Sequence, residues 1–135
     1  MKDSLSAGID TTRKFVVDAR RTIGFMGEGA KVYATPALVA DIEQTCRDMV
    51  LPHLDDGEDT VGTRVEIDHL AATLEGMTVE ISATVTSVDG RGVSFEITAR
   101  DPLDKICRCK HNRFVVDVGK TKERLLAKAA KAAGN

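Results

Sequence analysis

A glutamate lies beside the face of a predicted helix that should be buried. Residues 35–46 read TPALVADIEQTC, in which Leu38, Ile42 and Cys46 repeat every four residues, the spacing of an apolar stripe. Glu43 stands next to this stripe. A charged carboxylate on a buried face is costly unless it has a partner, so Glu43 is a candidate general base in a pocket. The alternative is that the stripe ends there and Glu43 lies at a solvated margin.

A histidine strengthens the first interpretation. His69 shares the alternating phase of Val65 and Ile67 in a predicted strand over 60–71, so its side chain points to the face that should pack against the helix. A lone histidine on such a face is more often a satisfied core residue than a catalyst. Together with Glu43, however, it would form the oriented acid–base pair that hydrolysis requires.

Thr35 is a third candidate, with a competing structural role. It suits the N-cap of the helix, and Pro36 suits the first helical position. Eight residues of unbroken helix would separate Thr35 from Glu43 by about 12 Å along the axis. Either the segment near Thr35 is therefore not helical, or the site combines residues from two subunits of a two-fold dimer. The helix N-terminus would also offer free N–H groups to an oxyanion.

Two further motifs favour structural roles. Cys107, Cys109 and His111 alternate on a predicted strand and project from one face, but this spacing is unlike that of common metal-binding loops. We interpret the cysteines as small buried side chains and predict no metal site. Gly27-Glu28-Gly29 lacks the following residues of a phosphate-binding loop, so it is interpreted as a flexible loop that could act as a lid.

Composition limits the class of protein. The chain has 135 residues, 42% of them hydrophobic and 30% charged, with a net charge of −2, which fits one soluble domain over 1–135. We expect no nucleic-acid partner because there is no overall basic field, and no membrane segment because no apolar run approaches about 20 residues. Three cysteines and the absence of a signal-peptide pattern favour the cytoplasm.

The remaining elements surround the central helix, which is expected to run to about Leu51. We predict strands over 11–17, 60–71, 77–88, 93–101 and 105–118, a short strand near 31–33, and a C-terminal helix over 120–133 with a basic surface. The strands alternate apolar and polar residues, and Asp89-Gly90-Arg91-Gly92 is a hairpin signal. An antiparallel sheet with one apolar face must cover it. The fold class is therefore α+β, with a curled sheet around one helix.

The chain resembles the hot-dog-fold thioesterases, most closely those similar to fluoroacetyl-CoA thioesterase. The stretches that carry the resemblance are TPALVADIEQTCRDMVLPHL, GEDTVGTRVEIDHLAAT and CRCKHNRFVV. They hold the Thr, Glu and His of the family at matching spacing, as Thr35, Glu43 and His69, and its strand glycine as Gly62. Two departures are a shorter loop before Thr35 and Cys109 in place of a glycine, so we do not predict specificity for a fluorinated acyl group.

The resemblance implies a homodimeric hydrolase that converts an acyl-CoA thioester to a carboxylic acid and coenzyme A at the subunit interface. Thr35, Glu43 and His69 would be catalytic, and no cofactor is expected beyond the coenzyme A of the substrate. The implied substrate-binding residues are Gly62, Arg64, His111, Phe25 and Tyr33. A hydratase or dehydratase on the same fold and a non-catalytic acyl-CoA-binding module are alternatives. The acyl group, an acyl-carrier protein as carrier, a tetramer, and the choice between base and nucleophile for Glu43 stay open.

Overall fold

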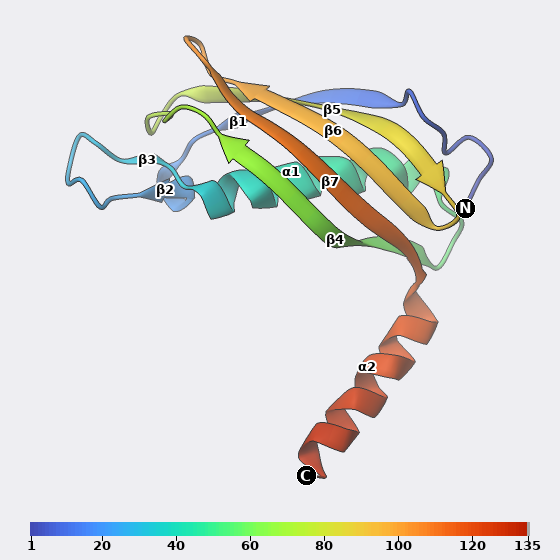
Figure 1. Ribbon diagram of the computed structural model, residues 1–135. Helices are drawn as coiled ribbons and strands as arrows, with labels where there is room; N and C mark the ends of the chain where they lie inside the picture. The colour runs from blue at the N-terminus through green and yellow to red at the C-terminus, as the bar shows by residue number, and fades with distance from the viewer. Residues whose placement is uncertain (135) are drawn as a thin grey trace.

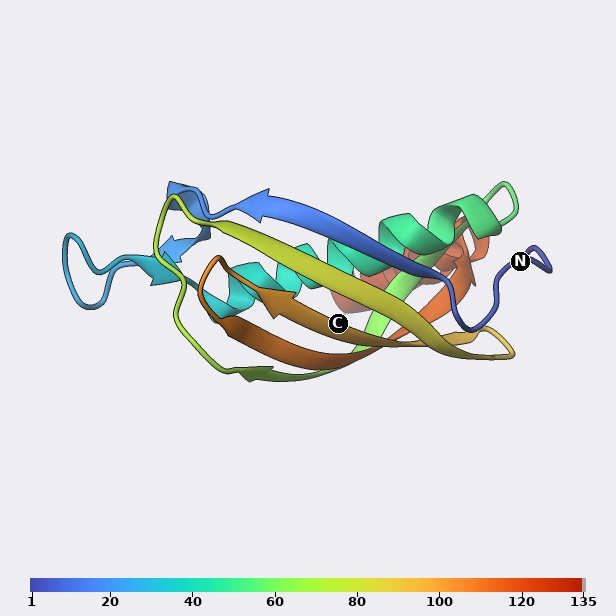
Figure 2. The same ribbon diagram turned by 90° about the horizontal axis from the view of Figure 1, so that it is seen from above.

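A five-stranded antiparallel sheet curls around one long helix in the computed structural model, which describes residues 1–134 (Figures 1 and 2). The strands lie in the order β1-β5-β6-β7-β4, and each pairs antiparallel with its neighbours. They are β1 (Asp10–Val16), β4 (Glu58–His69), β5 (Thr78–Asp89), β6 (Gly92–Arg100) and β7 (Lys105–Asp117). The predicted curled sheet around a central helix is confirmed, and β4 forms one edge of the sheet.

The core lies between the sheet and helix α1 (Thr35–Val50). The predicted apolar stripe is confirmed: its fully buried members are Leu38, Ile42, Cys46 and Val50. Alternate residues of β5, β6 and β7 face it from the sheet. Burial of each large aliphatic side chain stabilises the fold by roughly 1.5–3 kcal/mol, so this layer fixes the position of α1 against the strands.

The start of α1 differs from the prediction. Ala34, not Thr35, is the N-cap, and no side chain caps the helix there. Thr35 is the first helical residue, and its hydroxyl is bonded to His69 instead. The helix ends at Val50, followed by a single turn of 3-10 helix over Leu51–His53, as expected where Pro52 lacks an N–H group.

Strand β4 contains a bulge that the sequence pattern did not reveal. Gly62 pairs with Arg113 and Arg64 pairs with Asn112, which leaves Thr63 as an extra residue. One extra residue reverses the phase of alternation. Unbroken alternation would place Val61 on the inner face with Val65 and Ile67, but it lies on the outer face, 44% exposed, paired with Phe114. After the bulge, Ile67 and His69 point inward, opposite the buried Cys109 and Cys107.

Two segments extend from this body. The short ribbon of β2 (Thr22–Ile23) and β3 (Val32–Tyr33) carries the loop 24–31 away from the sheet, so the predicted loop and short strand are confirmed (Figure 1). Helix α2 (Val118–Ala133) projects from the end of β7 with no buried residue. Across residues 1–134, no helix combines the length and hydrophobicity needed to cross a membrane.

Candidate active site

The first polar pair lies where α1 begins and β4 ends. The Thr35 hydroxyl lies 2.8 Å from Nδ1 of His69, and the ring of Tyr33 packs edge-on against the imidazole, with centroids 6.5 Å apart. Burial lowers the pKa of His69, so its imidazole is neutral at neutral pH. Within residues 1–134, the buried Nε2 atom has no hydrogen-bond partner. The pair therefore presents a neutral imidazole with one nitrogen free to take a partner.

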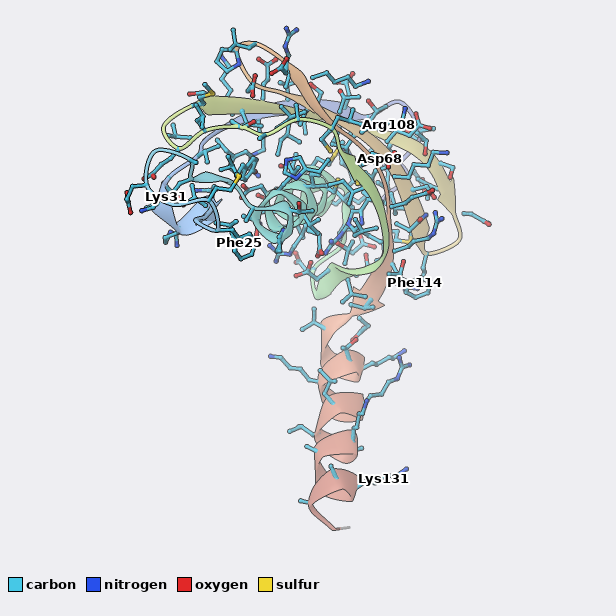
Figure 3. The ribbon with its side chains drawn as sticks, turned by 60° about the vertical axis from the view of Figure 1, so that its left-hand side comes forward. Phe25, Lys31, Asp68, Arg108, Phe114 and Lys131 are labelled. Carbon is cyan, nitrogen blue, oxygen red and sulfur yellow. The ribbon has the colours of Figure 1, made fainter. Side chains whose placement is uncertain are left out.

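A cleft of about 410 Å³ opens next to this pair. It lies between the β2–β3 ribbon, the first turn of α1 and the segment after β4. Its lining includes both predicted aromatic contacts, Phe25 and Tyr33. Phe25 stands on the projecting loop and is 88% exposed (Figure 3). The cleft is mostly apolar apart from Thr35 and His69, which suits an acyl or pantetheine chain.

The second polar group surrounds Glu43. Its Oε2 atom lies 3.5 Å from Nη1 of Arg113, whose side chain is 5% exposed whereas that of Glu43 is 43% exposed. Gly62 is next to both: a Cβ atom there would lie 3.2 Å from Oε2 of Glu43 and 3.4 Å from Nη1 of Arg113. Glu43 thus lies at the margin between α1 and β4, with a buried cation as its partner and its carboxylate packed closely over Gly62.

Arg113 is fixed by further hydrogen bonds. Its Nε and Nη2 atoms donate to the hydroxyl and the carbonyl of Thr60, at 2.7 and 3.0 Å. Its Nη1 atom lies 3.1 Å from Nε2 of His111. Sequence reasoning did not place Arg113 against Glu43. The available signal was its phase, because Arg113 shares the buried face of Cys109 and His111.

His111 is a structural neighbour of this arginine. Its Nδ1 atom donates to the carbonyl of Arg64 at 2.7 Å, and its Nε2 atom accepts from Arg113, so both ring nitrogens are engaged. Burial, together with the charge of Arg113, lowers the pKa of His111. Its ring stacks on Phe95 with centroids 5.9 Å apart. The histidine is therefore neutral and holds Arg113 in place.

The remaining predicted residues lie apart from these groups. The Arg64 side chain points to the outer face, where it pairs with Glu66 at 3.1 Å. The Tyr33 hydroxyl donates to Asp41, which also accepts from Arg21 at 2.8 Å. Only the ring of Tyr33 faces the cleft. The predicted contacts of Arg64 and Tyr33 with substrate stay predictions.

The cysteines of β7 behave as core residues. Cys107 and Cys109 are buried, as expected from their size and phase. Burial raises the pKa of their thiols to about 12 and about 11. His111, the third member of the alternating motif, has no free nitrogen. In the part of the chain that the structure describes, no three His, Cys, Asp or Glu side chains gather to hold a metal ion.

The two polar groups do not meet within one protomer. Helix α1 is continuous from Thr35 onward, so Thr35 and Glu43 are about 12 Å apart along its axis. Of the two explanations for their spacing, a non-helical start is thus wrong. A site that combines two subunits stays a prediction.

Comparison with known proteins identifies the family of this chain. Residues 17–119 match the family described as fluoroacetyl-CoA-specific thioesterase. The chain belongs to this family. The fluoroacetyl-CoA thioesterase of Streptantibioticus cattleyicolor is 34% identical to it over 127 residues, which cover 89% of this chain and 91% of that relative. A solved structure of fluoroacetyl-CoA thioesterase is 32% identical, with a TM-score of 0.85 over 93% of this chain and 98% of that chain.

Other solved structures agree on the fold of this fluoroacetyl-CoA-specific thioesterase family member. A Thermus thermophilus protein described as a thioesterase superfamily member is 26% identical, with a TM-score of 0.90 over 98% of this chain and 99% of that chain. A hot-dog-like protein from Thermanaerovibrio acidaminovorans has a TM-score of 0.83 over 90% of this chain and 91% of that chain, at 23% identity. The predicted hot-dog fold is confirmed.

Proposed function

We propose that this member of the fluoroacetyl-CoA-specific thioesterase family hydrolyses acyl-CoA thioesters to a carboxylic acid and coenzyme A, at a site built from Thr35, Glu43 and His69 at a dimer interface. Family membership supports the class of reaction. One observation supports the choice of site. His69 is a neutral base whose Nδ1 atom is hydrogen-bonded to Thr35, and the Nε2 atom of His69 lacks a hydrogen-bond partner in the protomer.

The edge position of β4 supports a two-fold dimer. This strand is 12 residues long and pairs on one side only, with β7, so its other side offers unpaired backbone groups to a second chain. Antiparallel pairing of two β4 strands would set the end of one beside the start of the other. His69 of the partner subunit would then lie near Gly62 and Glu43, which completes the three-residue site.

The proposed reaction uses groups of both protomers. Glu43 acts either as a general base on water or as the nucleophile. In the general-base form, the oxygen of water attacks the thioester carbonyl carbon, Glu43 accepts its proton, and the C–S bond breaks to release the thiolate of coenzyme A, which takes up that proton. His69 and Thr35 orient the reacting groups, and N–H groups at the start of α1 stabilise the oxyanion.

The proposed substrate contacts are those that the family resemblance of the sequence implies. Gly62 leaves room for the thioester because it has no Cβ atom. Phe25 and the ring of Tyr33 line the cleft that would hold the acyl or pantetheine chain. His111 would act through Arg113, whereas Arg64 could reach ligand only from the outer face. The proposal places the enzyme in the cytoplasm, and it invokes no metal or redox cofactor because a thioester is already activated.

The first experiment measures thiol release from short-, medium- and aryl-acyl-CoA substrates. We expect the wild type to release thiol and Glu43→Ala and His69→Ala to lose at least about a hundredfold in kcat/KM, as for other general acid–base residues. Asp10→Ala, which removes an exposed carboxylate from β1 at the edge of the sheet opposite to β4, is the matched control and should retain wild-type activity. Equal activity of all four proteins would refute the proposed site.

A mixing experiment tests whether the site is shared. If Glu43 and His69 come from different protomers, a heterodimer of the two inactive variants has one doubly substituted site and one intact site. Co-expression of the two variants should then restore about one quarter of wild-type activity, since about half of the dimers are mixed. A site contained in one protomer would give no recovery.

A further inference from the structure

Asp41 is a buried carboxylate that the proposed mechanism does not use. It lies on α1, two residues before Glu43, and is 8% exposed. Its Oδ2 atom accepts hydrogen bonds from the hydroxyl of Tyr33 and from Nε of Arg21, the second at 2.8 Å. Its Oδ1 atom accepts from Nη2 of Arg21 at 3.2 Å. Two residues of α-helix turn by about 200°, so Asp41 and Glu43 point to opposite sides of α1.

This carboxylate ties both strands of the projecting ribbon to the helix. Arg21 directly precedes β2, and Tyr33 is the last residue of β3. The carbonyl of Arg21 accepts a hydrogen bond from the N–H of Ala34 at 2.8 Å, and Nη1 of Arg21 donates to Asp18 at 2.9 Å. The Asp41 clamp, formed by Asp41, Arg21 and Tyr33, therefore fixes the base of the ribbon against the first turns of α1 (Figure 1).

The clamp includes the segment that contacts His69. Two side chains of residues 33–35 lie against the imidazole. The ring of Tyr33 packs edge-on, with centroids 6.5 Å apart and an interplanar angle of 83°, and the hydroxyl of Thr35 lies 2.8 Å from Nδ1. Within residues 1–134, Nε2 of His69 has no hydrogen-bond partner. The orientation of the imidazole in the protomer therefore depends on these two side chains.

Tyr33 connects the clamp to the imidazole. It is 1% exposed, and its hydroxyl donates to Asp41. Burial and the hydrogen bond to Asp41 raise the pKa of Tyr33, so the hydroxyl stays protonated and remains a donor. Edge-to-face pairs of rings prefer defined angles. A shift of the Tyr33 ring at its hydroxyl end would therefore move the imidazole of His69.

The ion pair of the clamp is better suited to fixing an orientation than to adding stability. Burial of the charges of Asp41 and Arg21 offsets much of their attraction, and apolar side chains of similar volume often serve a core as well. The pair is bidentate, however, and this geometry fixes the angle between the carboxylate and the guanidinium. A defined angle is what a group needs if it is to position a reacting residue.

We propose that Asp41 is a positioning residue for the hydrolysis: it holds the ring of Tyr33, which in turn holds the imidazole of His69 at the angle that the reaction requires. This inference rests on the proposed function, in which His69 orients the reacting groups. The lining of the cleft includes Tyr33 but not Asp41. Asp41 therefore acts on turnover through Tyr33 and not through contact with substrate.

Nuclear magnetic resonance of the histidine side chains tests this link without reference to activity. Tyr33→Phe removes one oxygen and keeps the ring, whereas Asp41→Asn removes the charge and keeps the shape. We expect both to shift the imidazole resonances of His69 and to raise its pKa toward the ordinary value, because a looser ring admits water to the imidazole. His111, whose ring nitrogens have other partners, is the internal control and should keep its resonances.

Steady-state kinetics of the full-length protein separates positioning from simple support of the cleft wall. Tyr33→Phe and Asp41→Asn should each lower kcat about three- to tenfold and leave KM nearly unchanged. The double variant should lose no more than about the larger single loss, because both changes cut the same link. Asp48→Asn is the matched control, since it removes another α1 carboxylate that is bonded to an arginine, Arg13, at 2.7 Å. It should retain wild-type kcat.

The outcomes distinguish this inference from the proposed function. Unchanged His69 resonances in both variants, or a raised KM with wild-type kcat, overturn the positioning role and leave the proposed function intact. If Asp41→Asn does not show the circular dichroism spectrum of the wild type, Tyr33→Phe alone decides. A wild type that releases no thiol from any acyl-CoA overturns the proposed function itself, and the His69 resonances then still decide whether Asp41 fixes the imidazole.

Discussion

Substitution of Gly62 by alanine is a sensitive test of the Glu43 environment. The added Cβ atom would lie 3.2 Å from Oε2 of Glu43, 3.3 Å from Cε1 of His111 and 3.4 Å from Nη1 of Arg113. These distances are shorter than ordinary van der Waals contact, so one neighbour has to move by a few tenths of an ångström. His111 and Arg113 are buried and hydrogen-bonded, whereas Glu43 is half-exposed. Glu43 is therefore the group that moves.

The expected size of the effect follows from this displacement. A misplacement of about 1 Å at a reacting group costs about a hundredfold in rate, so a few tenths of an ångström should lower kcat/KM about three- to tenfold. Stability should change little, within about 1 kcal/mol, because alanine reduces the entropy of the unfolded chain and so offsets the crowding. Gly62→Val, with two more methyl groups, should lose about a hundredfold.

Thiol release and urea unfolding measure the two quantities separately. Thr63→Ala, at the extra residue of the same bulge, is the matched control, because Thr63 is exposed and its one hydrogen bond goes to the carbonyl of Asn112. Wild-type kcat/KM for both Gly62→Ala and Gly62→Val would refute the reasoning, since it would mean that the position of Glu43 over Gly62 does not affect the reaction.

Three further predictions follow from the buried groups. Arg113→Met should lower the free energy of unfolding in urea by about 2–4 kcal/mol, because it leaves Thr60 and His111 without their buried donor; a loss below about 0.5 kcal/mol contradicts this. Since the pKa values of His69 and His111 are lowered on folding, the stability they contribute is present above about pH 6.5 and is lost as pH falls through their folded pKa values; urea titrations from pH 8 to 5 should show this fall, and His111→Gln should flatten it. The three cysteine thiols, which include Cys46 with a pKa raised to about 12, should resist Ellman's reagent at pH 8 in the native protein and react only after unfolding; rapid reaction of the native protein would contradict their burial.

The fold could be predicted from the sequence because each helix, strand and turn is indicated by a local pattern of residues. Alternation in β5, β6 and β7 and the four-residue repeat of α1 each follow from which side chains must be buried. The hairpin at Asp89-Gly90 and the loop around Gly27 follow from turn chemistry. The positions of these elements therefore agreed with the structure to within a few residues.

The arrangement of the candidate site was only partly accessible. Thr35 and His69 were selected by type and phase, but their direct hydrogen bond depends on where α1 starts, and the N-cap role assigned to Thr35 was wrong. The pairing of Arg113 with Glu43 requires knowledge of the register between β4 and β7 across a bulge. Such contacts between distant segments have no local signal.

The bulge at Thr63 changes which residues of strand β4 face inward. Before the bulge the even-numbered residues, such as Gly62, face inward, and after it the odd-numbered residues, such as His69, do. Gly62 and His69 therefore both lie on the inner face although seven positions separate them. A deletion of one residue between them that left the bulge in place would turn either His69 or Gly62 to the outer face. Length changes in this stretch among relatives should therefore occur two residues at a time, or else coincide with loss of the bulge.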